Sequence, residues 1–218
     1  DGIPELKAAI VAKFKRENGL DYKPANVSVG TGGKQVLYNA LLATLNPGDE
    51  VIMPAPCWVS YADIVLLGGG TPIFAETTAE DGYRLRPDVL DKAITPKTKW
   101  FVFNAPSNPT GAAYSRDALK ALTDVLMQPK NQHVWVLTDD MYEHLLYDGA
   151  THKSVASFSP AHYEHTIVVH GFAKAWSMTG WRLGWCAAPE PIARAIDAIQ
   201  SHSTSNPTSF AQKGGVAA

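Results

Sequence analysis

The sequence predicts an α/β fold: a three-layer sandwich around a mainly parallel sheet of seven strands. Short apolar runs alternate with segments of helical periodicity along the whole chain, which is typical of α/β proteins. The apolar runs are nearly continuous rather than alternating, as expected for parallel strands that are covered on both faces. With 218 residues, the chain is long enough to bury a large core without disulfides or a metal.

The seven predicted strands are short apolar runs bounded by turn residues. They span Val27–Val29, Val51–Met53, Pro72–Ala75, Trp100–Phe103, Val134–Leu137, Ile167–Val169 and Leu183–Ala187. Ligands of open α/β sheets bind at the carboxyl ends of the strands. The residues that directly follow each strand are therefore the candidates for chemistry.

The segments between the strands carry the apolar spacing and boundary residues of helices. The predicted helices are one that opens at Pro4 and ends before Gly19, then Lys34–Leu45, Trp58–Leu67, Pro87–Ile94, Ser115–Met127 and Pro191–Gln200. The polar stretch Ser201–Ser209 predicts a loop, and Phe210–Ala218 is again helix-like. We find no internal repeat and no linker.

Composition and charge exclude several classes of protein. The chain has 19 Lys and Arg against 21 Asp and Glu, a net charge of −2, which provides no positive field for nucleic acid or an anionic membrane. No apolar run is long enough for a transmembrane helix. Two cysteines, Cys57 and Cys186, are too few for a disulfide framework and favour the cytoplasm. Because the chain starts at Asp1 without a leader and stops inside a helix-like segment, we expect residues 1–218 to be one domain of a longer chain.

A glycine-rich segment, Gly30–Lys34, follows the first strand and opens a helix. Small residues at a helix N-terminus leave N–H groups that can bind a phosphate. The segment is not a Walker P-loop, because Ser28 replaces the first glycine and Gln35 replaces Ser or Thr. Gln35 also breaks the G-x-G-x-x-G pattern. A turn that merely starts a helix explains the same residues.

Two further strand ends carry groups that suit a planar ligand. Trp58 follows the second strand and offers a flat face, although a core tryptophan is the alternative. The loop Asn104–Gly111 follows the fourth strand, and its two prolines restrict the backbone that carries the Asn108 amide. A plain turn is the alternative there. The Asn108–Pro109 peptide bond is a candidate for the cis form.

The fifth and sixth strands are followed by charged residues in apolar surroundings. Asp139 directly follows an apolar run, where a carboxylate needs a cationic partner; a helix N-cap is the alternative, with Asp140 a candidate for that cap. Tyr142 adds a phenol. Lys174 lies among apolar and small residues, which predicts a desolvated, nucleophilic amine rather than the usual solvated surface lysine. Arg182 supplies a second cation.

Taken together, these groups suit one kind of ligand. A phosphate cradle, an aromatic platform, a carboxylate, a phenol, an amide, a lysine and an arginine match a phosphorylated aromatic aldehyde with a basic ring nitrogen, which is pyridoxal phosphate (PLP). A nicotinamide dinucleotide site would need the glycine fingerprint and a ribose-binding carboxylate, and the sequence lacks both. No metal site is predicted.

The same residues lie in motifs that resemble the class I PLP-dependent aminotransferases, in particular the bacterial aspartate aminotransferases. The segment Gly171–Gly184 resembles the family's lysine signature, and Asn108–Gly111 and Asp139 with Tyr142 resemble two further family motifs. The resemblance covers essentially the whole chain. It implies the large domain of a fold-type I PLP-dependent transferase, with the small domain largely missing.

The resemblance also implies roles for the catalytic residues. Lys174 would hold the cofactor as an internal aldimine and then act as the general base, while Asp139 would pair with the protonated pyridine nitrogen. Tyr142, with Asn108, would hydrogen-bond the 3-oxygen of the ring. One departure is Ala173, where many relatives carry a serine that contacts the phosphate.

The remaining cofactor-binding residues follow from the same resemblance. Trp58 would stack on the ring, and Arg182 would bind the phosphate. The backbone amides that would share the phosphate belong to Gly32, Gly33 and Lys34. The family's arginine for the substrate α-carboxylate, and a tyrosine that reaches the neighbouring subunit's phosphate, lie outside residues 1–218.

The expected function is transamination between an L-amino acid, with aspartate favoured, and a 2-oxo acid, 2-oxoglutarate. Aromatic, alanine and prephenate specificities stay open. The alternatives are another PLP reaction on the same scaffold, such as a β-lyase or a decarboxylase, and a truncated domain that binds cofactor without turnover. The family implies a homodimer, and no nucleic acid or membrane partner is expected.

Overall fold

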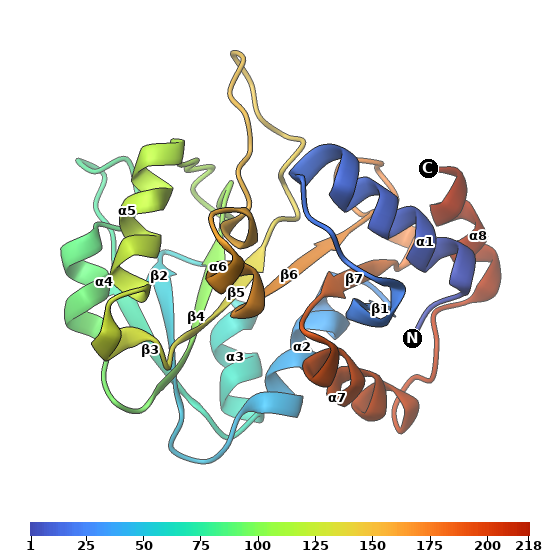
Figure 1. The fold of residues 1–218 in the computed structure, drawn as a ribbon, viewed down its shortest axis with the longest axis horizontal. Helices are drawn as coiled ribbons and strands as arrows, with labels where there is room; N and C mark the ends of the chain where they lie inside the picture. Colours follow the sequence, from blue (N-terminus) through green and yellow to red (C-terminus); the bar gives the residue numbers. More distant parts are fainter. The chain divides into compact units, whose positions relative to one another are not determined.

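The computed structural model describes residues 1–218, which divide into two compact units. Unit 1 comprises Asp1–Thr44 and Ile167–Ala218, and unit 2 comprises Leu45–Thr166. Each unit contains both strands and helices (Figure 1). The two units are described one at a time.

Unit 1 contains three strands in the order β1-β7-β6, with β6 counted from its second residue. Their bounds are Val27–Gly30 for β1, Thr166–Gly171 for β6 and Gly184–Ala187 for β7. β7 is antiparallel to both neighbours, and every residue of these strands is buried. The helices of this unit are α1 (Pro4–Lys13), α2 (Gly33–Thr44), α7 (Glu190–Ser201) and α8 (Ser209–Ala217). α2 packs against α7, and α1 packs against α8.

The first helix forms for the reasons that the sequence indicates. Pro4 occupies its first turn, where the missing N–H has no helical partner to lose. Leu6, Ile10 and Phe14 recur at helical spacing and are all buried. The helix continues as a short π-helical turn and ends at Gly19, whose φ of 68° is left-handed and favours glycine.

Unit 2 contains four parallel strands in the order β5-β4-β2-β3. Their bounds are Glu50–Ala55 for β2, Thr71–Glu76 for β3, Thr98–Asn104 for β4 and Trp135–Asp139 for β5. The helices are α3 (Ser60–Leu67), α4 (Pro87–Ala93), α5 (Arg116–Leu126) and α6 (Pro160–Glu164). The core of the unit packs apolar side chains of the sheet against α4 and α5, including Ile52, Leu90, Phe101, Phe103 and Leu122.

The register of β4 and β5 positions the polar residues of unit 2. Asn104 pairs with Asp139, so the last residues of the two strands lie side by side. Parallel strands bring their carboxyl ends to one edge, where the following loops also meet. Asp139 therefore ends a buried strand and stands next to the loop that begins after Asn104.

The α/β class and a mainly parallel set of seven strands are confirmed. Each predicted strand is present with small shifts of its ends. The helix predicted from Trp58 begins at Ser60 instead, because the backbone from Cys57 to Val59 forms a loop and a turn. The sequence missed α6, whose five residues are too few to show a period. Treatment of residues 1–218 as one domain stays a prediction.

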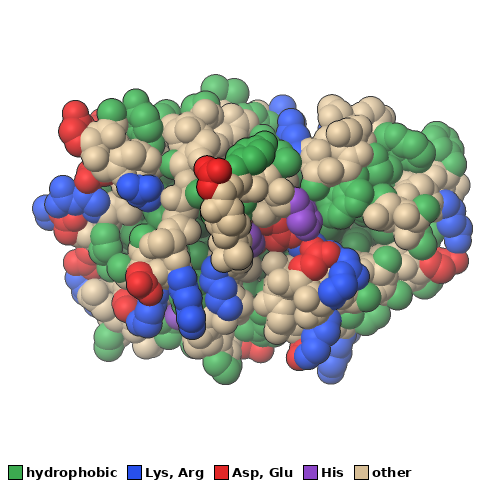
Figure 2. Space-filling model, turned by 90° about the horizontal axis from the view of Figure 1, so that it is seen from above, with side chains coloured by type: hydrophobic (Ala, Val, Ile, Leu, Met, Phe, Trp, Pro, Cys, Tyr) green, Lys and Arg blue, Asp and Glu red, His purple; other side chains and the backbone are tan.

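The surface charges and the lengths of the apolar helices agree with what the composition suggests. Figure 2 shows positive and negative side chains intermixed over one face of the molecule, without a large region of a single sign. No helix combines the length and apolar character needed to cross a bilayer.

Candidate active site

Asp139 is the central residue of the polar group in unit 2. It is only 6% exposed, and it accepts hydrogen bonds from the Tyr61 hydroxyl at 2.7 Å and from the Met141 N–H at 3.3 Å. Burial raises the pKa of its carboxyl to about 6, although both hydrogen bonds lower it; the neighbouring Asp140 raises it a little further. Neither hydrogen-bond donor carries a positive charge. The carboxylate therefore has the low-dielectric environment that the sequence predicts, and a cation would stabilise it.

Tyr61 is a site residue that sequence reasoning missed. It lies on α3, is 2% exposed, and donates its hydroxyl proton to Asp139. Burial, followed by the negative charge of Asp139, raises the pKa of this phenol well above its ordinary value, so it stays a neutral donor. Its position in the sequence, three residues after Trp58, was the one indication available. In the structure the Tyr61 N–H donates to the Trp58 carbonyl at 3.1 Å, so the two residues share one turn of the chain. The two rings meet edge to face, with centroids 5.3 Å apart.

Asn104 connects the loop after β4 to the end of β5. Its side-chain amide donates to the Asp139 carbonyl at 2.7 Å, and its Oδ1 accepts the Asn108 N–H at 2.7 Å. A further backbone bond from Gly111 to Ser107, at 2.8 Å, closes the loop. The Asn108–Pro109 peptide bond is cis, which confirms that prediction. The sequence analysis treated Asn104 only as the first residue of this loop.

Tyr142 and Asn108 converge beside this carboxylate. The Asn108 Nδ2 lies 3.5 Å from the Tyr142 hydroxyl oxygen. Burial and the charge of Asp139 raise the pKa of Tyr142, while the hydrogen bond from Asn108 lowers it. No helix starts after β5, so neither Asp139 nor Asp140 is an N-cap. The structure thus brings the predicted phenol and amide together.

In unit 1, the glycine-rich segment forms a tight turn before α2. Gly32 has a φ of 94°, and its N–H donates to the Gly30 carbonyl at 2.9 Å. This amide is therefore engaged in the turn, contrary to the expectation that it is available to a phosphate. α2 begins at Gly33, and Lys34 follows in the first helical turn.

Arg182 packs its guanidinium directly on this turn. A Cβ added at Gly32 would lie 2.5 Å from the Arg182 Nη2, so a side chain there would displace the cation. The Arg182 Nη1 also donates to the Thr179 carbonyl at 3.0 Å. Gly184 on β7 approaches so closely that a Cβ would overlap the Gly33 nitrogen. A guanidinium and a helix N-terminus therefore meet at one place, an arrangement that suits an anion.

Lys174 lies in the irregular segment between β6 and β7. Its carbonyl accepts the Ser177 N–H at 3.0 Å, and the Thr179 hydroxyl donates to the Ala173 carbonyl at 3.0 Å. The Lys174 side chain is exposed, so the prediction of a desolvated lysine is wrong for this chain. Phe172 turns inward from the same segment. Apolar neighbours in sequence do not bury a residue when the backbone is irregular, because no fixed period sets which side chains share a side.

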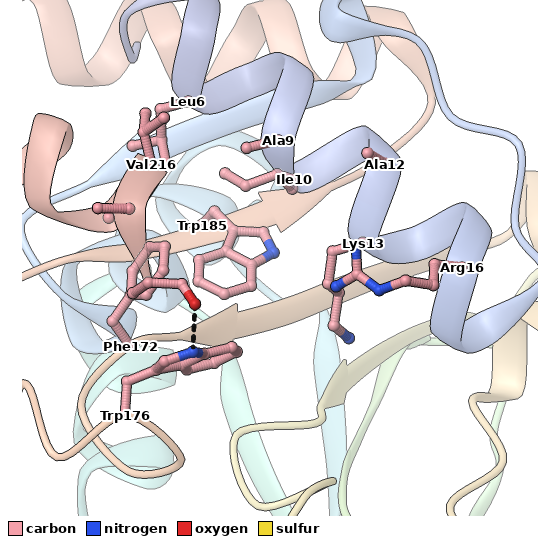
Figure 3. A pocket seen from close by; sticks show the side chains of 13 residues that line it. Leu6, Ala9, Ile10, Ala12, Lys13, Arg16, Phe172, Trp176, Trp185 and Val216 are labelled. Atoms are coloured by element: carbon pink, nitrogen blue, oxygen red, sulfur yellow. Dashed lines mark hydrogen bonds between the residues drawn. The ribbon is translucent and has the colours of Figure 1, made fainter.

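The loop that carries Lys174 is anchored by aromatic packing (Figure 3). The Phe172 ring lies 4.7 Å from the Trp185 ring and 5.3 Å from the Trp176 ring, measured between centroids. The Trp176 Nε1 donates to the Ala218 carbonyl at 3.1 Å. These rings line a cavity of about 340 Å³ together with side chains of α1, and none of the predicted site residues lines it. The loop is thus held from its apolar side.

The fold places this chain in the α/β class, and each unit carries polar groups beside the ends of its strands. Comparison with known proteins makes this class more specific. The family model described as aminotransferase class I and II matches residues 1–218, and the chain belongs to that family.

Characterised relatives and solved structures agree with this assignment. The chain is 59% identical over 212 residues to the aspartate/prephenate aminotransferase of Cereibacter sphaeroides, covering 97% of this chain and 52% of that protein. The crystal structure of the aspartate aminotransferase from Rhizobium meliloti superposes with a TM-score of 0.96 at 47% identity, covering 99% of this chain and 54% of the other. An aromatic aminotransferase from Pyrococcus horikoshii gives a TM-score of 0.94 at 39% identity, covering 99% and 57%.

The match confirms the expected fold of the fold-type I large domain. The chain spans about half the length of the curated relatives that it matches. The activity of the whole protein, its substrates and its partners are therefore taken up below as proposals.

Proposed function

We propose that this protein is a PLP-dependent aminotransferase that moves the amino group of L-aspartate to a 2-oxo acid, 2-oxoglutarate. Membership of the aminotransferase family supports the reaction class. Relatives named aspartate aminotransferase or aspartate/prephenate aminotransferase support aspartate as the amino donor. The observation that carries the proposal is Asp139, a buried carboxylate whose two donors are both uncharged.

The residues of unit 2 fit the ring of PLP. A buried carboxylate without a nearby positive charge is costly to ionise. A protonated pyridine nitrogen is a cation that would offset this free-energy cost. The Asn108 amide and the Tyr142 phenol are polar donors suited to a ring oxygen. The Trp58 ring lies against the ring of Tyr61, whose hydroxyl donates to Asp139, so it is close to these polar groups.

The residues of unit 1 fit the phosphate of PLP. The Arg182 guanidinium supplies a fixed positive charge with several N–H donors. Gly33 and Lys34 open α2, and the N–H groups of a first helical turn can bind a phosphate oxygen. Gly32 is required because a side chain there would occupy the position of the guanidinium.

PLP, when bound, supplies an aldehyde that reacts with amino groups and a ring that withdraws electrons from the substrate Cα. With PLP bound, Asp139 would hold the proton on the ring nitrogen, while the Tyr61 hydroxyl keeps the carboxylate oriented. Tyr142 and Asn108 would hydrogen-bond the 3-oxygen of the ring. The Nζ of Lys174 would take the proton from the substrate Cα and deliver it to C4′ of the cofactor.

Covalent trapping tests the proposed role of Lys174. We expect protein incubated with PLP to absorb near the visible edge, and borohydride treatment to fix one cofactor on the peptide that contains Lys174. Lys174→Ala should abolish both signals. Lys213→Ala is the matched control, because Lys213 is an exposed lysine of the same unit that pairs with Glu5. Trapping on another lysine, or on none, would reject the assignment.

Product analysis tests the reaction and its substrate. The full-length protein with aspartate and 2-oxoglutarate should yield oxaloacetate and glutamate in equal amounts, without ammonia. Release of ammonia would instead indicate a β-lyase, and conversion of aspartate to alanine or β-alanine would indicate a decarboxylase. Prephenate is a second candidate amino acceptor, supported by the names of two relatives at 59% and 58% identity. A direct comparison of kcat/KM for the two oxo acids decides between them.

A homodimer is the assembly that we propose from the family resemblance. Sedimentation equilibrium of the full-length protein should give twice the mass of one chain. A monomer that still performs the complete reaction would contradict it.

A further inference from the structure

We infer that His152 is a positioning residue for this site, acting through Asp140 and Glu143 on the turn that carries Tyr142. The inference rests on the proposed function, in which Tyr142 orients the cofactor ring. His152 itself touches none of the groups assigned to the cofactor. It belongs to the loop that runs from the turn after β5 toward Val155.

The evidence is a nearly buried cluster of three side chains in unit 2. The Asp140 Oδ1 accepts the Thr138 hydroxyl at 2.6 Å, and its Oδ2 lies 3.1 Å from the His152 Nε2. The same His152 nitrogen lies 3.9 Å from the Glu143 Oε2. Asp140 is 1% exposed and Glu143 is 7% exposed. One imidazole nitrogen thus faces two carboxylates of a single turn.

The charges explain why this histidine is needed. Two buried carboxylates repel each other, and each is costly to bury without an opposite charge. The His152 Nε2 is the polar atom that lies between the two carboxylates and separates them. Glu143 also meets His144, whose Nε2 lies 3.6 Å from its other oxygen, whereas His152 is the histidine that faces both Asp140 and Glu143.

The connection to Tyr142 is through the backbone of the turn. Tyr142 stands between Asp140 and Glu143 in sequence, and the Glu143 N–H donates to the Asp140 carbonyl at 3.0 Å. The Leu145 N–H donates to the Tyr142 carbonyl at 2.8 Å. Holding the side chains on both sides of Tyr142 therefore fixes the direction of its ring, which ends 3.5 Å from the Asn108 amide. Without His152, carboxylate repulsion would open this turn.

The first experiment uses the cofactor-free protein and follows the Tyr142 ring directly. In protein labelled with ¹³Cζ-tyrosine, the Tyr142 resonance is the one that Tyr142→Phe removes. We expect His152→Leu to move it toward the position of an exposed tyrosine. His152→Gln, which keeps a polar side chain beside Asp140, should retain most of the original shift. Thr151→Val is the matched control from the same loop, because Thr151 is exposed, and it should leave the resonance in place.

An unchanged Tyr142 resonance in His152→Leu would overturn the inference. If that variant does not fold, His152→Ser takes its place, because it also removes the imidazole and leaves both carboxylates of the turn unchanged. The resonance should still move, because the nitrogen that faces Asp140 and Glu143 is gone. If it stays in place, His152 does not position Tyr142.

The second experiment measures the affinity for PLP at equilibrium. His152→Leu and Tyr142→Phe should each weaken binding by about tenfold, the scale of one well-placed hydrogen bond. The double variant should be no weaker than the more affected single variant, because both changes remove the same interaction. Additive losses, or a lower melting temperature with unchanged affinity, would make His152 a purely structural residue. If the unaltered protein takes up no PLP, the proposed function fails, and the tyrosine resonance still decides the role of His152.

Discussion

The buried carboxylate of Asp139 makes a specific prediction about stability in the absence of cofactor. Its pKa in the fold is about 6, above the ordinary 3.8, so the folded state binds this proton more tightly than the unfolded state does. Between these pH values the unfolding free energy falls as the pH rises, because the unfolded chain has already released the proton. Over about two pH units this loss amounts to about 3 kcal/mol, and it is complete above pH 6.

Asp139→Asn removes this loss, because an amide does not ionise in this range. The Asn carbonyl can still accept the Tyr61 hydroxyl, but the Met141 N–H loses its acceptor, at a cost of about 1 kcal/mol. We expect the substitution to raise the unfolding free energy by about 2 kcal/mol at pH 8 and to lower it by about 1 kcal/mol at pH 4. With PLP bound, the order at pH 8 should reverse, because the cation then stabilises the carboxylate.

Urea unfolding followed by tryptophan fluorescence at both pH values provides the measurement. Asp124→Asn is the control, because Asp124 is an exposed carboxylate paired with Lys120 on α5, and such pairs contribute little. A cofactor-free Asp139→Asn protein that is less stable than the unaltered protein at pH 8 would refute the reasoning. It would mean that the buried carboxylate is already compensated within the chain.

Three other substitutions follow from single contacts. Gly32→Ala forces a side chain into a backbone with φ of 94° and against Arg182, so it should destabilise the fold by more than about 1 kcal/mol and weaken PLP binding at least about tenfold in calorimetric titration. Tyr61→Phe removes a hydrogen bond that lowers the pKa of Asp139, so the pH range over which stability falls should extend upward by about one unit; an unchanged pH dependence of urea unfolding would contradict this. Ser115→Ala removes the N-cap of α5, which accepts the Ala118 N–H at 3.2 Å, and should lower the unfolding free energy by about 1 kcal/mol without affecting PLP binding.

The strands and most helices could be predicted because their signals are local. A short, continuous apolar run such as Val134–Leu137 is typical of a strand that is buried on both faces. Its assignment as a strand therefore follows from the local sequence. The low-dielectric environment of Asp139 could be predicted for the same reason, since a residue at the end of a buried strand stays close to the core. The cis form of the Asn108–Pro109 peptide bond was a candidate because a proline follows Asn108 in a constrained loop.

The partners of these residues could not be predicted, because they come from distant parts of the chain. The Tyr61 hydroxyl reaches Asp139 from helix α3, and the His152 ring reaches Asp140 from a loop without regular structure. For Lys174 the prediction from the sequence was wrong. Its apolar neighbours suggested burial, whereas the irregular backbone leaves its side chain exposed.

The amino-acid sequence by itself determined the strands, most of the helices and the chemical groups that follow the strands, because these depend on side chains only a few positions apart. Tertiary structure decided which donor faces each acceptor, which amides remain available and which side chains meet solvent. Those outcomes depend on hydrogen-bond distances and packing between segments far apart along the chain, and no local pattern encodes them. Asp139 is an example of each. Its position after an apolar run could be identified in the sequence, whereas the Tyr61 hydroxyl that orients its carboxylate could not.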